Sequence, residues 1–142
     1  MANAIQFLNN RQNGTTYPKT ASVAFAPGMA VQINGTTGFI EPADNATPIL
    51  GITNESVQST DSNFATNDPI SVSEAVYNDQ LLFTVTTGPA TAAMVGRYLA
   101  LDAASTGVII TGISATVSAA TPILVTKFIN ATTIQGKIAF RF

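Results

Sequence analysis

Histidine and cysteine are both absent from the 142 residues of this sequence. Without histidine, a histidine-assisted catalytic triad and the commonest metal ligand are excluded. Without cysteine, there is no disulfide, thiolate metal site or cysteine nucleophile. A Ser–Lys dyad is formally open, but no serine or threonine has a residue nearby in sequence that would activate it. The sequence therefore predicts that the protein is not an enzyme and has no catalytic residues.

Eight carboxylates are the other groups that could carry out acid–base chemistry. A pair of carboxylates can hydrolyse glycosidic bonds. However, the chain contains no tryptophan and three tyrosines, so it lacks an obvious platform on which a sugar would stack. We therefore interpret the carboxylates as solvated surface residues.

One polar loop, residues 53–68, includes the carboxylate and amide side chains of Asp61, Asn63, Asn67 and Asp68 within eight residues. Such oxygens could hold a hard cation such as Ca²⁺. Their spacing does not match a calcium-binding loop, and residues of these types are typical of turns. The sequence thus predicts a turn here, and neither a metal nor a cofactor.

Charged residues are few and unevenly placed. They make up 10% of the chain, against about 25% in ordinary soluble domains, and the net charge is −2. Between Thr20 and Gly96 there is no lysine or arginine but there are seven carboxylates, and the basic residues lie toward the two ends. An acidic middle argues against nucleic acid as a partner. A head-to-tail contact between the acidic middle and the basic ends would mainly set register.

The surface that this composition predicts is rich in Thr, Ser, Asn, Gln and Ala. It repels neighbours weakly and so suits packing beside copies or partners. The alternative is a secreted β-module that happens to be rich in Thr and Asn. The N-terminus lacks a secretory signal, and the longest uncharged stretch, 103–126, contains eight Ser and Thr residues and three Gly or Pro residues. We expect a soluble protein that is made in a cytoplasm and does not enter a membrane.

The elements expected from the hydrophobic pattern are short β-strands. Met29, Val31 and Ile33 alternate with smaller or polar residues, as in a half-buried strand, and residues 81–85 read as a buried strand. About ten such strands at 8–12-residue spacing indicate a small antiparallel β-barrel or sandwich. Residues 90–95 are the only credible helix. We predict one all-β domain over residues 21–142.

Residues 1–20 form a polar leader with one apolar cluster at Ile5, Phe7 and Leu8. Too few apolar residues are present for this segment to fold alone, so we predict an extended N-terminal arm. The alternative is a disordered tail. The apolar cluster makes docking on a partner plausible.

The chain also contains an internal repeat. Residues 28–34 parallel residues 96–102, and a Thr-Gly turn with an apolar pair follows each. Both copies then reach the same pentapeptide, Ala-Thr-Pro-Ile-Leu, at 46–50 and 120–124. We predict two repeat units, at about 28–52 and 96–125, each a hairpin with a return strand. Because such a unit is too small to close its own core, we expect the two units to share one core.

This duplicated pattern resembles the small head decoration proteins of tailed bacteriophages, also called cement or capsid auxiliary proteins. The resemblance covers about residues 21–142, and the polar arm before it fits too. Its most specific part is the duplication with Ile49-Leu50-Gly51-Ile52. One departure is that the second pentapeptide runs into Val125-Thr126-Lys127 without the Gly-Ile step.

The resemblance implies a compact β-barrel-like body that binds the outer surface of an assembled virion capsid. The partner would be the major capsid protein, and the protein would act as a homo-oligomer, often a trimer near local threefold axes. It would staple adjacent subunits against the pressure of the DNA inside, with many modest contacts acting together. On this interpretation Ile5, Phe7 and Leu8 are the apolar anchors, and Arg11 and Lys19 are their polar partners.

Two other functions remain open from the sequence. One is a carbohydrate-binding or adhesin-type module of a phage fibre or surface protein, which would need an exposed aromatic cluster. The three tyrosines, at positions 17, 77 and 98, are too scattered in sequence to form an evident one. The other is a different structural protein of the phage head or tail, which would share the same chemistry.

Overall fold

The computed structural model describes residues 4–8, 14–75 and 79–142. The all-β prediction is confirmed, and the predicted helix at 90–95 is a single 3₁₀ turn in the structure. In chain order, the described elements are β1 (Gln6–Phe7), β2 (Gly14–Pro18), β3 (Ala30–Ile33), β4 (Ile40–Pro42), β5 (Gly51–Thr53), β6 (Pro69–Glu74), β7 (Leu81–Thr87), η1 (Ala92–Met94), β8 (Tyr98–Leu101), β9 (Val108–Ser114), β10 (Ile123–Asn130) and β11 (Thr133–Ile138).

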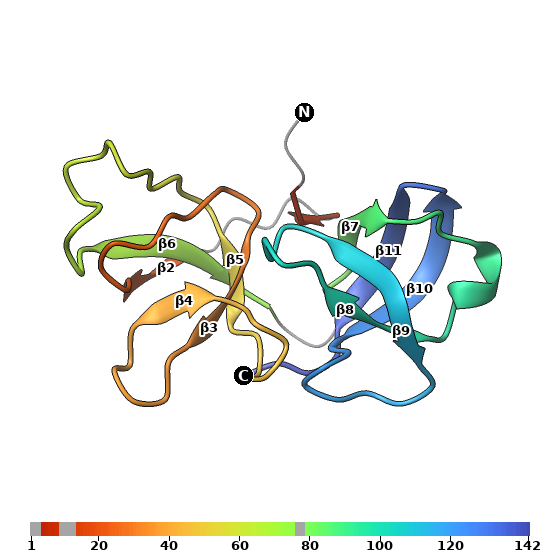
Figure 1. Ribbon diagram of the computed structural model, residues 1–142. Coiled ribbons are helices and arrows are strands. Elements are labelled where there is room, and N and C mark those ends of the chain that lie inside the picture. The colour runs from red at the N-terminus through yellow and green to blue at the C-terminus, as the bar shows by residue number, and fades with distance from the viewer. Residues whose placement is uncertain (1–3, 9–13, 76–78) are drawn as a thin grey trace.

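The strands form two sheets, which lie side by side as the two lobes of the molecule (Figure 1). The first sheet has the order β2-β6-β5-β3-β4, and the second has the order β7-β11-β10-β8-β9 with β1 added outside β7. Taken in chain order, β2 to β6 and β7 to β11 therefore occupy the same five places in their sheets. We call β2–β6 the first unit and β7–β11 the second unit.

Each sheet closes on itself through a parallel contact between its first and third strands. In the second unit β7 pairs with β9, where Val85 lies opposite Val108. In the first unit a single parallel bridge joins Lys19, directly after β2, to Ile40 of β4. The two units are thus small barrels of the same topology, and within each described unit the closing contact is parallel whereas the ladders between the other strands are antiparallel.

The equivalence of the two units extends to individual residue pairs. Tyr17 of β2 lies opposite Ile70 of β6, and Phe83 of β7 lies opposite Ile134 of β11. The β3–β4 and β8–β9 hairpins also match, because both loop glycines before them, Gly28 and Gly96, have a positive φ. The repeat is therefore larger than the predicted hairpin with a return strand, since each copy contains five strands.

The identical pentapeptides are not in structural register. Val31 and Leu99 occupy the same place in the two units, and their partners are Gly51 and Ile123, respectively. Ile123 therefore corresponds to Gly51 and not to Ile49, the residue at its position in the pentapeptide. The shift is two residues, which in a strand leaves the same side chains facing the core.

The buried apolar residues form two clusters, so the prediction of one shared core is wrong. The first unit has its own cluster, which includes Phe25, Ile40 and Ile70. The second cluster fills the barrel of β7–β11 and continues between the units. Its members from the first half of the chain are Ile5, Ala30, Ala43, Ile49 and Ile52.

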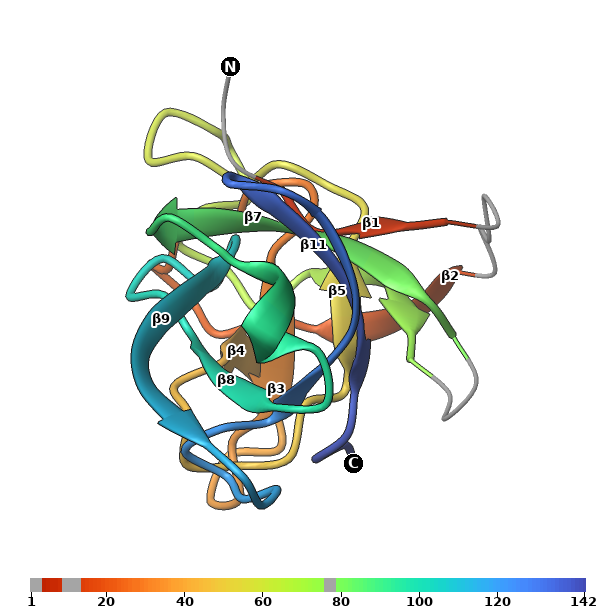
Figure 2. The same ribbon diagram turned by 90° about the vertical axis from the view of Figure 1, so that its right-hand side faces the viewer.

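The structure corrects the predicted N-terminal arm for the residues that it describes. β1 pairs with β7, with Phe7 opposite Leu81, and β2 is paired with β6 along its whole length. Figure 2 shows β1 lying beside β7. These residues are extended, as predicted, but they belong to the folded body, so the domain does not begin at residue 21. The sequence did not show this because a two-residue strand has too few positions to display a period.

Candidate functional site

The predicted anchor residues are divided between the core and the surface. Ile5 is 2% exposed and its N–H donates to the carbonyl of Gly28 at 2.9 Å, so it packs within its own chain. Phe7 is partly buried against the second core, whereas Leu8 is 45% exposed. Of the three apolar anchors, Leu8 alone is an exposed large side chain.

The two basic residues of the predicted site do not form a surface pair. Lys19 is fully buried, and its Nζ donates to the carbonyl oxygens of Phe64, at 3.2 Å, and Thr66. Arg11 lies outside the described residues. Lys19 therefore fastens the polar loop before β6 to the first barrel, and it cannot act as a polar contact to a capsid without unfolding this region.

The oxygen-rich loop at 53–68 is a turn, as predicted. Asp61 accepts from the N–H of Gln58 at 2.8 Å, and the amide of Asn67 donates to the carbonyl of Lys19 at 2.8 Å. These side chains thus serve the fold of the loop. Within the described ranges, no three acidic residues are grouped in a way that could hold a metal ion.

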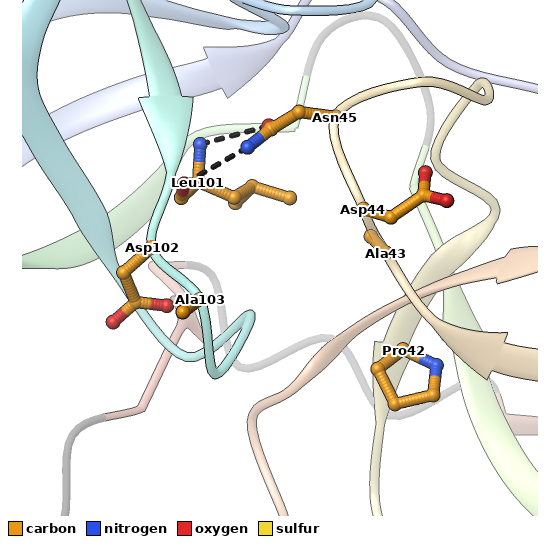
Figure 3. Close-up of a pocket in the computed structure, with 7 residues that line it drawn as sticks. All are labelled: Pro42, Ala43, Asp44, Asn45, Leu101, Asp102 and Ala103. Atoms are coloured by element: carbon orange, nitrogen blue, oxygen red, sulfur yellow. Dashed lines mark hydrogen bonds between the residues drawn. The ribbon is translucent and has the colours of Figure 1, made fainter.

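An open hollow of about 410 Å³ lies between the two units (Figure 3). Its lining comes from both units: Pro42, Ala43, Asp44, Asn45, Leu101, Asp102 and Ala103. Both carboxylates in it already hold turns, since Asp44 accepts from the N–H of Ala46 and Asp102 accepts from the N–H of Thr106, each at 3.0 Å. The hollow therefore lies where the two units meet, and both of its carboxylates are engaged in turns.

The two units are held together by hydrogen bonds of Asn45, of Ser105 and of residues 140–142. We call this set of contacts the seam. Asn45 contacts the main chain of Leu101 twice, donating from Nδ2 to its carbonyl and accepting from its N–H, both at 3.0 Å. The fully buried Ser105 accepts from the N–H of Ala30 with its carbonyl, at 2.7 Å, and donates from its hydroxyl to the carbonyl of Ala43. Sequence reasoning missed these residues. The one signal in the sequence was the residue type at position 45, because asparagine adopts a positive φ more readily than most residues. In the structure the φ of Asn45 is 61°.

A second part of the seam comes from the C-terminal residues. The N–H of Ile49 donates to the carbonyl of Phe140 at 3.1 Å, and the N–H of Phe142 donates to the carbonyl of Ile49 at 2.8 Å. Residues that follow the last strand of the second unit thus pair with the first unit. Conversely, β1 pairs with the second unit. The two barrels are joined at both ends of the described chain as well as through Asn45 and Ser105.

The surface of the two units differs in charge and in apolar exposure. The described part of the first unit, residues 14–75, carries six carboxylates and the buried Lys19, a net charge of −5, whereas residues 79–142 have a net charge of +2. Among the described residues, the large apolar side chains that are exposed are Leu8, Val95, Ile113, Val117, Ile129 and Phe142. All of these except Leu8 lie in the second half of the chain, so the less acidic unit is also the one with apolar contact area.

Comparison with known proteins does not assign a family. No protein-family model matches the chain, and no curated protein matches it. No helix in the described part of the chain is both long enough and apolar enough to cross a membrane.

Proposed function

We propose that this protein is a non-catalytic structural component of a bacteriophage virion that binds the outer surface of the capsid. It bridges neighbouring copies of the major capsid protein and stabilises the shell against internal pressure. The observation that carries this proposal is the duplicated body: two barrels of the same topology are locked together by the seam into one two-lobed unit.

A body of this kind is suited to bridging because both lobes are closed barrels with a fixed connection. Each lobe can contact a different subunit, and a rigid connection between two contacts raises the effective concentration of the second contact once the first has formed. Modest contacts are therefore sufficient. The sequence resemblance to head decoration proteins adds the expectation of a trimer at local threefold axes.

The contact surface that we assign to this function differs from the one expected from the sequence. Leu8 remains a candidate, and Ile113, Val117 and Ile129 of the second unit join it because these side chains are 40–45% exposed. Ile113 and Val117 lie close together in sequence, at the end of β9 and in the loop that follows it, so this pair is the one chosen for the test. Ile5 and Lys19 act in folding instead.

The proposal is tested by mixing the purified protein with heads assembled without it. We expect saturable binding at a fixed number of copies per head, and a higher temperature of head disruption once binding is saturated. Replacing Ile113 and Val117 together by serine should weaken attachment at least about tenfold without changing the melting temperature, because apolar anchors carry most of the energy of an interface. Ala115→Ser, at an exposed position between them, is the matched control.

Two results would contradict the proposal. One is an absence of binding to heads that lack the protein. The other is specific, saturable binding to a glycan array by a protein that ignores the heads, which would favour the carbohydrate-binding alternative.

A further inference from the structure

The two units differ at one edge. In the second unit the outer edge of β7 is covered by β1, which pairs Gln6 with Leu82 and Phe7 with Leu81. In the first unit the corresponding strand is β2. Its outer side meets β4 only after the strand ends, where Lys19 bridges to Ile40, and no strand in the described part of the chain pairs with the outer side of residues 14–16. Because Tyr17 corresponds to Phe83, the residues equivalent to Leu81 and Leu82 are Thr15 and Thr16. The duplication thus reveals a strand position that is filled in one barrel and open in the other.

The main-chain groups of Thr16 point toward this open side. In an antiparallel sheet, alternate residues of a strand direct their N–H and C=O groups to opposite neighbours. The carbonyl of Ser71 accepts from the N–H of Asn54 at 3.0 Å, so Ser71 faces β5. Thr16 lies opposite Ser71 across the β2–β6 pair and therefore faces away from β6.

The second unit shows how such an edge is used. There the carbonyl of Gln80 accepts from the N–H of Leu8 at 3.0 Å. Gln80 corresponds to Gly14, and Leu82 corresponds to Thr16. In each unit, main-chain groups therefore face outward at two residues that are two positions apart. The segment 14–16 of the first unit presents the same main-chain pattern that 80–82 offers to β1.

The edge of β2 also lacks most of the features that normally prevent pairing. Gly14, Thr15 and Thr16 are all exposed, and none of the five residues of β2 is charged. Natural edge strands are usually blocked by lysine, proline or a bulge. Pro18 provides one such block, since it has no N–H, and it restricts the open edge to residues 14–16.

We propose that the β2 edge at Gly14–Thr16 binds an extended segment of a partner protein as an added strand, as β7 binds β1. The segment is uncharged or basic, because the first unit has a net charge of −5. It carries an apolar side chain opposite Thr15, where Phe7 lies opposite Leu81 in the second unit. The identity of the partner as a capsid subunit rests on the proposed function; the strand addition itself does not.

The test uses the intact protein, labelled with ¹⁵N, and a synthetic peptide that copies β1 with lysine at each end, Lys-Ala-Ile-Gln-Phe-Leu-Lys. We expect saturable shifts of the amide signals of residues 14–17. We also expect the Thr16 amide to exchange rapidly with solvent in the free protein and at least about tenfold more slowly with bound peptide. Thr15 and Tyr17, which face β6, should be protected in both states.

The matched variants are Thr16→Pro, which removes the outward N–H, and Thr16→Val, which keeps it. Proline should weaken peptide binding at least about tenfold and valine about twofold or less, with the fold of each checked by circular dichroism. If the proline variant fails to fold, the exchange rate of the Thr16 amide in the native protein decides. The inference is overturned if the peptide causes no shift of the amide signals of β2, or if Thr16→Pro binds the peptide as tightly as the native protein. It is also overturned if the protection of the Thr16 amide rises with protein concentration alone, because a second copy of the chain would then occupy the edge.

Binding to heads separates the two proposals. If Thr16→Pro binds heads as tightly as the native protein, the capsid subunit is overturned as the partner of the β2 edge, while the proposed function stands and the peptide experiment decides the strand addition. If the native protein does not bind heads but binds the peptide at β2, the proposed function fails and the strand-addition site stands with another partner.

Discussion

Gly51 shows why one position needs different residues in two units of the same topology. It occupies the place of Ile123, yet a Cβ atom at Gly51 would lie against the carbonyl oxygen of Ser73 and 2.9 Å from the Cα of Glu74. Both neighbours are main-chain atoms of β6, which cannot move aside without disturbing the sheet. The first unit therefore closes around a glycine at this position.

We predict that Gly51→Ala lowers the free energy of unfolding by about 2–4 kcal/mol, measured by denaturant titration, because it forces two paired strands apart. Gly35→Ala is the control, since a Cβ there has no atom within 4 Å and should change stability by about 0.5 kcal/mol or less. Equal effects of the two substitutions would show that the close approach at Gly51 is relieved at little cost.

At the scale of the element, the long loop between β5 and β6 depends on Lys19. The equivalent residue in the second unit is Val85, which fills the barrel with an apolar side chain. The second unit joins the equivalent strands, β10 and β11, by a two-residue turn and has no such loop to hold. A buried amine that reaches the carbonyls of Phe64 and Thr66 is thus the first barrel's adaptation to its longer connection.

We predict that Lys19→Met lowers the free energy of unfolding by about 1–3 kcal/mol, because the carbonyl of Thr66 loses its donor. Amide exchange should accelerate selectively in residues 58–68, and the second unit should keep its native rates. Lys127→Met, at an exposed position, should leave both stability and exchange unchanged. Uniform acceleration across the chain would argue that Lys19 supports the barrel as a whole and not this loop.

At the scale of the whole molecule, the seam determines whether the two barrels unfold together. Its most specific contact is Asn45, which pairs with both main-chain groups of Leu101 from a residue with a φ of 61°. Loss of this side chain leaves two main-chain groups of the second unit without partners from the first. Since the second core continues into the seam, damage there should affect both units.

We predict that Asn45→Gly lowers the free energy of unfolding by about 1–3 kcal/mol through the two lost hydrogen bonds. Asn45→Ala should cost about 1 kcal/mol more, because alanine is strained at a positive φ whereas glycine is not. Calorimetry should show one transition for the native protein and a broader or split transition for both variants. A glycine variant with native stability would contradict the role that we assign to this contact.

The sequence predicts a strand correctly where the alternation of apolar and polar residues continues over several positions. The alternation over residues 81–85 is long enough to show a buried face, and Leu81, Phe83 and Val85 are indeed buried while the residues between them are only half-buried. The expected turns and the absence of a long helix follow from the same signal. The duplicated segment 28–34 and 96–102 likewise gives two equivalent strands.

The features that the sequence did not reveal depend on contacts between distant residues. The sequence around Lys19 gives no sign that this lysine is buried, since its partners lie 45 and 47 residues away. The identical pentapeptides suggested a register that is two residues wrong, because strand register is decided by neighbouring strands. The open edge of β2 becomes visible only when the two units are compared in three dimensions.

Each barrel receives main-chain hydrogen bonds from a segment that lies next to the other barrel in the chain. This arrangement affects whether one copy of the repeat can be lost in evolution. When two tandem copies are independently folded domains, either copy can be deleted while the other keeps all its main-chain partners. Here β1 precedes the first barrel but completes the sheet of the second, and residues after the second barrel bond Ile49 of the first. A deletion that removed one copy would strip main-chain partners from the survivor, so selection for a foldable product is enough to keep both.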